Sequence, residues 1–304
     1  IFILSFILIS LCSKGYSITL YDALKQTYND NTQLNAEREN FKASEEDINI
    51  SKADFKPLLT LSGSKSKEDT NKLTNQSGGD ATINDVDPFT TSIKLEQTLL
   101  DFDRSISHER NIIGLDLAKA KLIKKEQDIF FEAIEAYTHL ILARETLDIN
   151  KKNLNLLNRQ VENDKIRLDR GQITITDLSQ SESSFAGAQA KFIESKNDLL
   201  ISKLTYENII GKIQDPNLLQ KNSRAIVSIP KSLDDAISVS KINNPDILIA
   251  KFELNQTEKD LESSKADLKP TAALSLERSY SEDASSTIDE REKDVLKATV
   301  SWPF

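Results

Sequence analysis

Residues 51–57 read SKADFKP and residues 264–270 read SKADLKP, so one seven-residue motif occurs twice, 213 positions apart. The same shift aligns residues 20–62 with residues 233–275, where about 14 of roughly 43 pairs are identical and many others exchange one apolar residue for another. A similarity that keeps its register through a helix, a proline and the residues beyond it indicates an internal duplication. We therefore expect two copies of one structural unit.

Each copy predicts a short helix, then a longer helix, then a strand. Asn31 and Asn244 suit helix N-caps, and Pro245 suits a first helical turn. The longer helix should run to Pro57 or Pro270, because proline lacks an N–H group and disfavours the helical conformation of the residue before it. These two prolines are the expected helix-to-strand junctions.

A β-hairpin is expected after each proline, because apolar residues recur there at every second position. The second strands should lie near residues 93–99 and 296–302, and the polar loops of the hairpins over residues 65–90 and 281–294. Strands of about 9–11 residues with one apolar face suit a membrane barrel, but a half-buried sheet in a soluble protein gives the same alternation. Aromatic residues near the expected strand ends would suit a membrane interface: Phe89, Phe102, Tyr280, Trp302 and Phe304.

A helical hairpin of unusual length is expected between the two copies. Residues 104–168 contain no proline and one glycine, and their apolar residues recur at spacings of three, four and seven. Such spacings are typical of helices that pack along a coiled-coil seam. Gly171 can adopt the left-handed conformation that ends this helix, and Thr174 or Thr176 can cap a return helix over residues 177–210.

The N-terminal residues predict a targeting segment. Residues 1–11 read IFILSFILISL, which is too short for a membrane-spanning helix but fits the apolar core of a secretory signal peptide. Residues 15–17 form a small-x-small cleavage site, and a buried N-terminal strand is the alternative. Cys12 could instead be acylated, although the large Leu11 before it disfavours that reading.

This interpretation divides the chain into consecutive segments. They are a signal peptide (1–17), the helices of the first repeat (18–57), its β-hairpin (58–102), the long helical hairpin (103–212), a linker (213–232), the helices of the second repeat (233–269) and its truncated β-hairpin (270–304). By the repeat arithmetic, roughly 110–130 residues of a second helical hairpin and a C-terminal linker are expected beyond these 304. The chain contains no methionine, so its N-terminus is also expected to be incomplete.

Composition excludes several function classes. The 304 residues carry a net charge of −9, which argues against a nucleic-acid partner. A single cysteine excludes a disulfide scaffold and clustered-cysteine metal sites, and His108 and His139 lie too far apart in sequence to suggest a metal centre. The sequence shows no nucleophile elbow, phosphate loop or paired-carboxylate motif, so we expect neither an enzyme nor a cofactor.

Together these motifs resemble the TolC-type outer-membrane efflux proteins over nearly the whole chain. The resemblance rests on the NPDI sequence at residues 244–247, the Pro-x-x-x-Leu pattern at both junctions, the QTLLDF sequence at residues 97–102, and the turn over residues 171–178. No single motif is specific, but their order, spacing and duplication together are.

The resemblance implies a mostly α fold with β, in which a long antiparallel helical hairpin contributes to an α-barrel. Its two β-hairpins would give four strands to a trimeric 12-stranded outer-membrane β-barrel, with the helices extending into the periplasm. The implied function is that of a passive channel-tunnel in a tripartite efflux or type I secretion system. The implied partners are a homotrimer, a periplasmic adaptor, an inner-membrane pump of the RND or ABC type, and outer-membrane lipid.

The resemblance also implies roles for single residues. Gly171, Ile173, Thr174, Thr176 and Asp177 would lie at the periplasmic entrance of the tunnel and contact the adaptor. Asp177 would latch a neighbouring helix and favour cations; the alternative is an ordinary first-turn acid that interacts with the helix dipole, and both can be true at once.

Two other classes of protein remain as alternatives. A periplasmic adaptor also has a long helical hairpin, but it would need β-rich, lipoyl-like segments on either side of it. A soluble coiled-coil scaffold would need neither a signal segment nor two paired alternating runs that end in aromatic residues.

Overall fold

The computed structural model describes residues 17–69, 86–221, 230–285 and 288–303. The predicted signal peptide up to residue 16, Cys12 within it, and Phe304 lie outside the described residues. The chain divides into two compact units, residues 1–38 with 122–238 and residues 39–121 with 239–304. Among the described residues, no helix combines the length and the apolar character needed to cross a bilayer.

The helices of the two copies have the same lengths. α1 (Leu20–Asp30) and α5 (Leu233–Asn243) have 11 residues each, and α2 (Thr32–Ala53) and α6 (Pro245–Ala266) have 22 residues each. Each pair of helices is offset by the 213 positions that separate the two sequence motifs. The predicted internal duplication is therefore confirmed in the secondary structure.

The predicted asparagine caps begin the longer helices. The Asn31 side-chain carbonyl accepts hydrogen bonds from the backbone N–H groups of Gln33 and Leu34, at 3.0 and 3.1 Å. Asn244 accepts one from the N–H of Asp246 at 2.8 Å, and Pro245 occupies the first helical position. These bonds satisfy backbone donors that have no partner within the helix.

Both longer helices end earlier than predicted. α2 ends at Ala53 and α6 at Ala266, four positions before the proline of each copy. The N–H of Lys56 donates to the carbonyl of Ala53 at 2.9 Å, and the N–H of Lys269 donates to that of Ala266 at 2.8 Å. A separate turn thus intervenes, since the residue before a proline is disfavoured in helical conformation.

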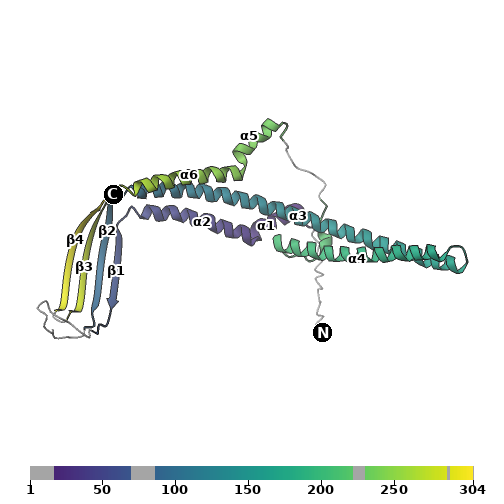
Figure 1. The fold of residues 1–304 in the computed structure, drawn as a ribbon, viewed down its shortest axis with the longest axis horizontal. Helices are drawn as coiled ribbons and strands as arrows, with labels where there is room; N and C mark the ends of the chain where they lie inside the picture. The colour runs from purple at the N-terminus through teal and green to yellow at the C-terminus, as the bar shows by residue number, and fades with distance from the viewer. Residues whose placement is uncertain (1–16, 70–85, 222–229, 286–287, 304) are drawn as a thin grey trace, which may run out of the picture. The chain divides into compact units, whose positions relative to one another are not determined.

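The four strands form one antiparallel sheet in the order β1-β2-β3-β4, as Figure 1 shows. Their bounds are Leu58–Lys65 for β1, Phe89–Leu100 for β2, Thr271–Ser285 for β3 and Ile288–Ser301 for β4. The central pair, β2 and β3, joins the two copies although the long helical hairpin separates them in sequence. Within the described residues β1 and β4 each pair with one strand, so both edges of the sheet are open.

The predicted loop over residues 281–294 is wrong. β3 continues to Ser285 and β4 begins at Ile288, so most of that stretch is paired, for example Ser281 with Arg291. The polarity of these residues suggests a loop, but polar side chains occupy strands wherever a sheet face meets water. In the first hairpin a bridge between Glu68 and Val86 continues the pairing, and residues 70–85 lie outside the described residues.

The sheet has one apolar and one polar face, because alternate residues of a strand point to opposite sides. The register places these residues together on the apolar face: Leu59, Leu61, Ile93, Leu95, Leu274, Leu276, Leu296, Ala298 and Val300. The polar face carries mainly Thr60, Ser62, Ser92, Lys94, Glu96, Ser275, Glu277, Ser279, Lys293, Lys297 and Thr299. On the apolar face, Leu61 is 80% exposed and Val300 is 74% exposed, so the described chain leaves this face largely uncovered.

The long helical hairpin consists of α3 (Phe102–Asp169, 68 residues) and α4 (Ile175–Ile209, 35 residues). The first unit has an apolar core where α1 meets these two helices: Ala23, Ala133, Ala136, Tyr137, Leu140, Ile141, Tyr206, Ile210, Ile213 and Leu219. The hydroxyl of Tyr137 lies 2.6 Å from the carbonyl oxygen of Gln220 and 3.0 Å from that of Ile18. The core therefore also fixes the chain segments on either side of the hairpin.

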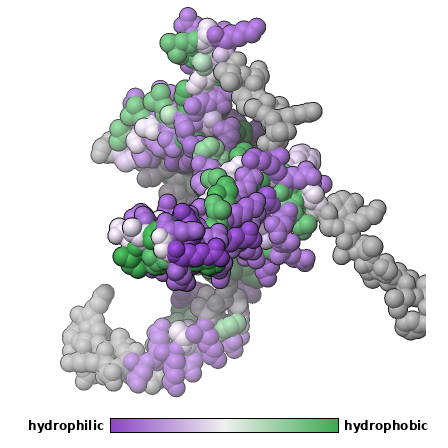
Figure 2. All heavy atoms as spheres, turned by 90° about the vertical axis from the view of Figure 1, so that its right-hand side faces the viewer, coloured by the Kyte–Doolittle hydropathy of each residue, from purple (hydrophilic) through white to green (hydrophobic). Residues whose placement is uncertain are grey.

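The surface around the turn between α3 and α4 is mainly polar. Figure 2 views the molecule from the side of this turn, and hydrophilic residues cover most of what is visible, with smaller hydrophobic patches between them. Among the exposed apolar residues near the turn are Ile166 and Ile175, which are 50% and 65% exposed. Apolar side chains are also exposed away from the turn, for example Leu142 (59%) on α3 and Leu204 (57%) on α4.

Candidate functional site at the turn between α3 and α4

Gly171 ends α3 in the way the sequence predicts. Its φ of 71° is left-handed, and its N–H donates to the carbonyl of Leu168 at 2.8 Å. The N–H of Gln172 donates to the carbonyl of Arg167 at 2.9 Å. These two bonds form a Schellman motif, which satisfies helix-terminal carbonyls and reverses the chain. A Cβ atom at this position would touch nothing, so the requirement for glycine comes from the backbone conformation alone.

Thr174 begins α4 through a capping box with Asp177. The hydroxyl of Thr174 accepts from the N–H of Asp177 at 3.3 Å, and the Asp177 carboxylate accepts from the N–H of Thr174 at 2.9 Å. The backbone bond to Thr174, followed by the bond from its hydroxyl, lowers the pKa of Asp177. Thr174 is therefore the cap, and Thr176 is a residue of the first helical turn.

The turn brings the five predicted entrance residues together within seven positions. Gly171, Thr174, Thr176 and Asp177 are exposed, and Ile173 is half-buried. The same capping box occurs between Thr19 and Asp22 at the start of α1, where it also lowers the pKa of the aspartate. The hydrogen bonds of Asp177 are therefore those of an ordinary helix start, and they leave the outward side of its carboxylate accessible.

A buried hydrogen bond close to the turn was not anticipated from the sequence. The hydroxyl of Ser181 on α4 donates to the carboxylate of Asp164 on α3 at 2.6 Å, and both residues are buried. The guanidinium of Arg167 lies 3.5 Å from the other carboxylate oxygen. A charged acceptor makes a short, strong hydrogen bond, so this pair fixes the register of the two helices below the turn. The only feature of the sequence that could have indicated this pair is a polar residue at a position of the helix that faces the seam.

A hollow of about 690 Å³ lies along α3 beside the turn. Its lining includes three arginines and one acid: Arg159, Arg167, Arg170 and Asp164. The exposed guanidinium groups can form bidentate hydrogen bonds with carboxylates, so this surface suits an acidic protein segment.

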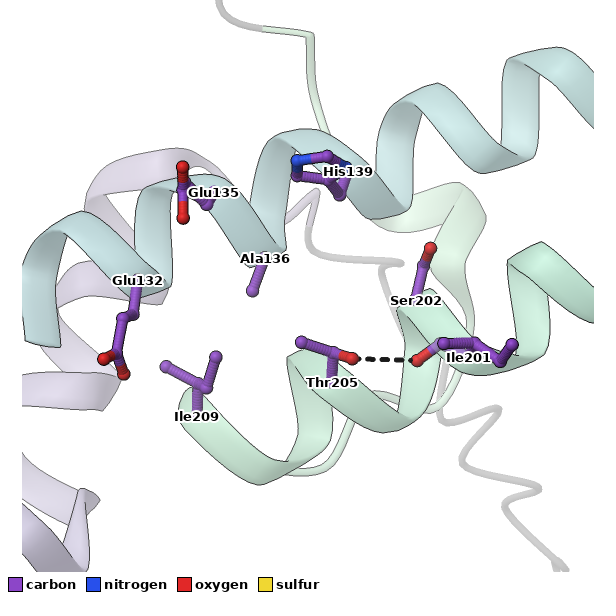
Figure 3. A pocket seen from close by; sticks show the side chains of 8 residues that line it. All are labelled: Glu132, Glu135, Ala136, His139, Ile201, Ser202, Thr205 and Ile209. Carbon is purple, nitrogen blue, oxygen red and sulfur yellow. Dashed lines mark hydrogen bonds between the residues drawn. The ribbon is translucent and has the colours of Figure 1, made fainter.

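A second hollow, of about 300 Å³, lies between α3 and α4 in the first unit. Figure 3 shows Glu132, Glu135 and His139 on α3 above Ser202 and Thr205 on α4. Thr205 donates its hydroxyl to the carbonyl of Ile201 at 3.1 Å, so that hydroxyl already has a backbone partner. In the part of the chain that the structure describes, no group of three or more His, Cys, Asp or Glu is arranged to hold a metal ion.

The other histidine packs beside the first junction, within the second unit. His108 Nδ1 lies 2.8 Å from the hydroxyl of Ser51, and its ring meets that of Phe55 edge-on. Arg104 donates to the carbonyl of Asp54 at 2.9 Å and stacks over Phe55 at 4.6 Å. Arg104, which the sequence marked only as a helix residue, thus ties the start of α3 to the turn after α2.

The junction and aromatic residues lie as follows. Pro57 directly precedes β1 and Pro270 directly precedes β3. Phe102 is the first residue of α3, 40% exposed, with the Lys269 ammonium 4.7 Å from its ring centre. Trp302 follows β4 and is 59% exposed.

Tyr280 does not lie near a strand end. It pairs with Glu292 in the interior of β3, because that strand continues past it to Ser285. Phe89, by contrast, is the first residue of β2.

Comparisons with known proteins agree with this architecture. The family model described as "Outer membrane efflux protein" matches residues 23–212. The outer membrane efflux protein BepC of Brucella suis biovar 1 is 26% identical over 262 residues, which cover 85% of this chain and 54% of that protein. The alkaline protease secretion protein AprF of Pseudomonas aeruginosa is 20% identical over 303 residues, which cover 98% of this chain and 63% of AprF.

A solved structure shows the same fold at lower identity. The outer membrane channel CmeC of Campylobacter jejuni superposes with a TM-score of 0.69 at 13% identity, covering 94% of this chain and 61% of CmeC. The chain therefore spans between about half and two-thirds of the length of these relatives.

Proposed function

Because the chain belongs to the outer membrane efflux protein family, we propose that the protein is the outer-membrane conduit of an efflux or type I secretion system. Substrates would pass through it from a pump to the cell exterior without covalent chemistry. Its relatives are named as efflux and secretion proteins, and members of the family are channels rather than enzymes.

The two-faced sheet is the observation that carries this proposal. Its apolar face suits lipid and its polar face suits a water-filled lumen, which is the alternation of membrane β-barrels. Both edges of the sheet are open, and an open edge in lipid would leave several backbone groups without hydrogen bonds. Four strands are too few to close a barrel. Three copies would supply twelve strands and pair every edge.

The helical hairpin would extend from the membrane into the periplasm. Its turn would form the tunnel entrance, with Gly171, Ile173, Thr174, Thr176 and Asp177 next to a periplasmic adaptor that joins the conduit to an RND or ABC pump. The polar turn and the nearby arginine-lined hollow support a protein contact there. Pro57 and Pro270 would mark the change from tunnel to barrel, and Phe102 and Trp302 would lie at the membrane interface, together with Phe304.

Conductance of the full-length protein in planar bilayers tests the conduit and the role of Asp177 together. The wild type should give discrete channels and migrate on a gel as a trimer that heat dissociates. Asp177→Ala should open more readily and lose part of its cation preference, because a carboxylate at a narrow entrance attracts cations. A monomer without channel activity would contradict the proposed function.

Asp22→Ala is the matched control for this experiment. It removes the same capping-box carboxylate from α1, away from the turn between α3 and α4. Both variants lose one helix-start interaction, so a change in conductance that is restricted to Asp177→Ala reports on the entrance. Equal conductance of the two variants would mean that Asp177 acts only as a helix-capping residue.

A further inference from the structure

Acidic and basic residues alternate along β4 near the hairpin tip. Residues 289–294 read DEREKD, so that Glu290, Glu292 and Asp294 point to one side of the strand while Arg291 and Lys293 point to the other. A loop would not sort these charges. The strand does: one side of β4 carries three acids, and the other side carries the two cations followed by Asp289.

Contacts on the apolar side show where the acids lie. The Arg278 guanidinium on β3 approaches the carboxylates of Glu292 and Asp294 at 3.3 and 3.8 Å. Arg278 and Asp294 share a row with Ile93 and Leu61 at the tip-side end of the apolar face, and Glu292 lies one row nearer the hairpin tips. Charged side chains are costly at the bilayer centre, so this cluster would lie beyond the hydrocarbon layer.

The two cations lie on the polar face in rows of hydroxyl side chains. Each row consists of residues that pair directly across the four strands, and we call the two rows the basic rows: Ser62, Ser92, Ser279 and Lys293, and Ser64, Thr90, Ser281 and Arg291. Hydrogen bonds of 2.7 Å between the hydroxyls of Ser62 and Ser92 and of 3.1 Å between those of Thr90 and Ser281 confirm that these side chains share a face.

The basic rows contain no carboxylate. Asp289 lies two positions from Arg291 on the same side of β4, and Glu277 lies two positions from Ser279 on the same side of β3. Among the described residues neither Arg291 nor Lys293 forms an ion pair with a carboxylate, whereas Lys94, nearer the junctions on this face, pairs with Glu96 at 2.5 Å. Six hydroxyl donors and two cations without carboxylate partners form a surface that favours anions.

We propose that the basic rows form an anion-selective collar inside the conduit and favour solutes that carry carboxylate or phosphate groups. This inference rests on the proposed function, because the polar face lines a lumen only if the apolar face meets lipid. In a trimer the collar would hold six cations. It would act on cargo after the acidic entrance at Asp177, with the opposite charge preference.

The double variant Arg291→Ser/Lys293→Ser of the full-length protein, measured in planar bilayers under a KCl gradient near 0.1 M, tests the collar. In water, one unit charge about 8 Å from a permeating ion changes the local concentration of that ion roughly twofold before screening. The double variant removes two cations from each chain. The local concentration of anions should then fall and that of cations should rise. We therefore expect the chloride-to-potassium permeability ratio to fall by about threefold. In 1 M KCl the Debye length shrinks to about 3 Å, so the difference from the wild type should nearly vanish.

The matched control is the double variant Glu290→Gln/Glu292→Gln. It removes two charges from positions adjacent to Arg291 and Lys293 on the same strand, but these charges lie on the opposite face of the sheet. Its permeability ratio should stay within about 1.3-fold of the wild type, because its charges lie outside the lumen. A charge-retaining variant, Arg291→Lys/Lys293→Arg, should also keep the wild-type ratio.

The outcomes separate the two proposals. Channels whose permeability ratio is the same in the wild type and the serine variant would overturn the collar and leave the conduit intact, and so would a control that shifts the ratio as much as the serine variant does. A wild type that forms no channels would overturn the conduit itself. If the double variant fails to assemble, the single variant Lys293→Ser tests the collar instead. Its chloride-to-potassium permeability ratio should fall by about 1.5-fold.

Discussion

The two copies of the repeat have the same local structure and different surroundings. α1 and α5 both have 11 residues and begin at equivalent positions, yet Ala23 and Thr27 of α1 are buried and no residue of α5 is. The longer helices also differ in burial at one aligned pair of residues. Leu34 of α2 is fully buried, while its counterpart in α6, Ile247, is 42% exposed. α1 packs into an apolar core with α3 and α4, whereas α6 contacts α3 through ion pairs such as those of Arg110 with Asp260 and Glu109 with Lys259.

This difference separates what starts a helix from what buries it. Caps, prolines and turn residues act over a few positions, so they start helices at equivalent positions in both copies. Burial depends on a partner surface, and most helical stability in proteins comes from such packing. Three predictions test how far the two copies differ.

The largest expected effect comes from truncating the aligned pair of apolar residues. Leu34→Ala should cost about 3 kcal/mol of unfolding free energy, because it leaves a cavity at a fully buried site. Ile247→Ala should cost less than about 1 kcal/mol, since its side chain is already partly in water. Denaturant unfolding of the full-length protein measures both. Equal losses would mean that another part of the assembly covers α6 and that the copies are equivalent.

A smaller effect concerns the alkaline stability of the core that only the first copy has. Burial raises the pKa of Tyr206 to about 12, from about 10 in an unfolded chain. A raised pKa means that the stabilisation is fully present below pH 10 and is lost as the pH rises from about 10 to about 12. At about 1.4 kcal/mol per pH unit, the wild type should lose about 2 kcal/mol more than Tyr206→Phe over this window.

The measurement is the unfolding free energy of wild type and Tyr206→Phe at pH 9 and at pH 12. At pH 9 the two proteins should differ little, which serves as the internal control. If both lose the same stability on going to pH 12, then Tyr206 is not shielded and the core around α1 is looser than the structure shows.

The smallest effect compares two equivalent caps. Thr19 caps α1, and its counterpart Ser232 accepts a hydrogen bond from the N–H of Asp235 at 3.1 Å at the start of α5. Thr19→Ala should cost about 1 kcal/mol of global stability, because α1 is part of the core. Ser232→Ala should instead speed hydrogen exchange in the first turn of α5 and leave the unfolding midpoint unchanged. A shift of the midpoint in Ser232→Ala would show that α5 is also held by packing.

Sequence reasoning located the elements whose signals are local. The caps at Asn31 and Asn244 and the left-handed Gly171 follow from residue types that satisfy helix ends in a known way, whereas the choice of Thr174 over Thr176 as a cap came only from the structure. The extent of β3 and β4 was missed, because polarity alone does not distinguish a loop from a strand whose faces both meet water.

The side-chain contacts near the candidate sites could not be predicted for a different reason. Asp164 and Ser181 lie 17 positions apart on opposite sides of the Gly171 turn, and they form a buried pair only where α3 and α4 fold back against each other. Arg104 contacts residues that precede it by about 50 positions, and no local pattern signals such a partner. Contacts of this kind depend on how whole elements pack.

The sequence by itself determined the duplication, the helix starts, and the alternation that gives each strand two unlike faces, because all of these arise from interactions between residues close in the chain. Tertiary structure alone decided that β2 and β3 lie side by side, and that pairing brings the apolar residues of four strands onto one face and gathers the hydroxyl and basic residues on the other. The physical reason is that the register of β2 against β3 couples residues 172 to 193 positions apart, and a one-residue slip would exchange the two faces.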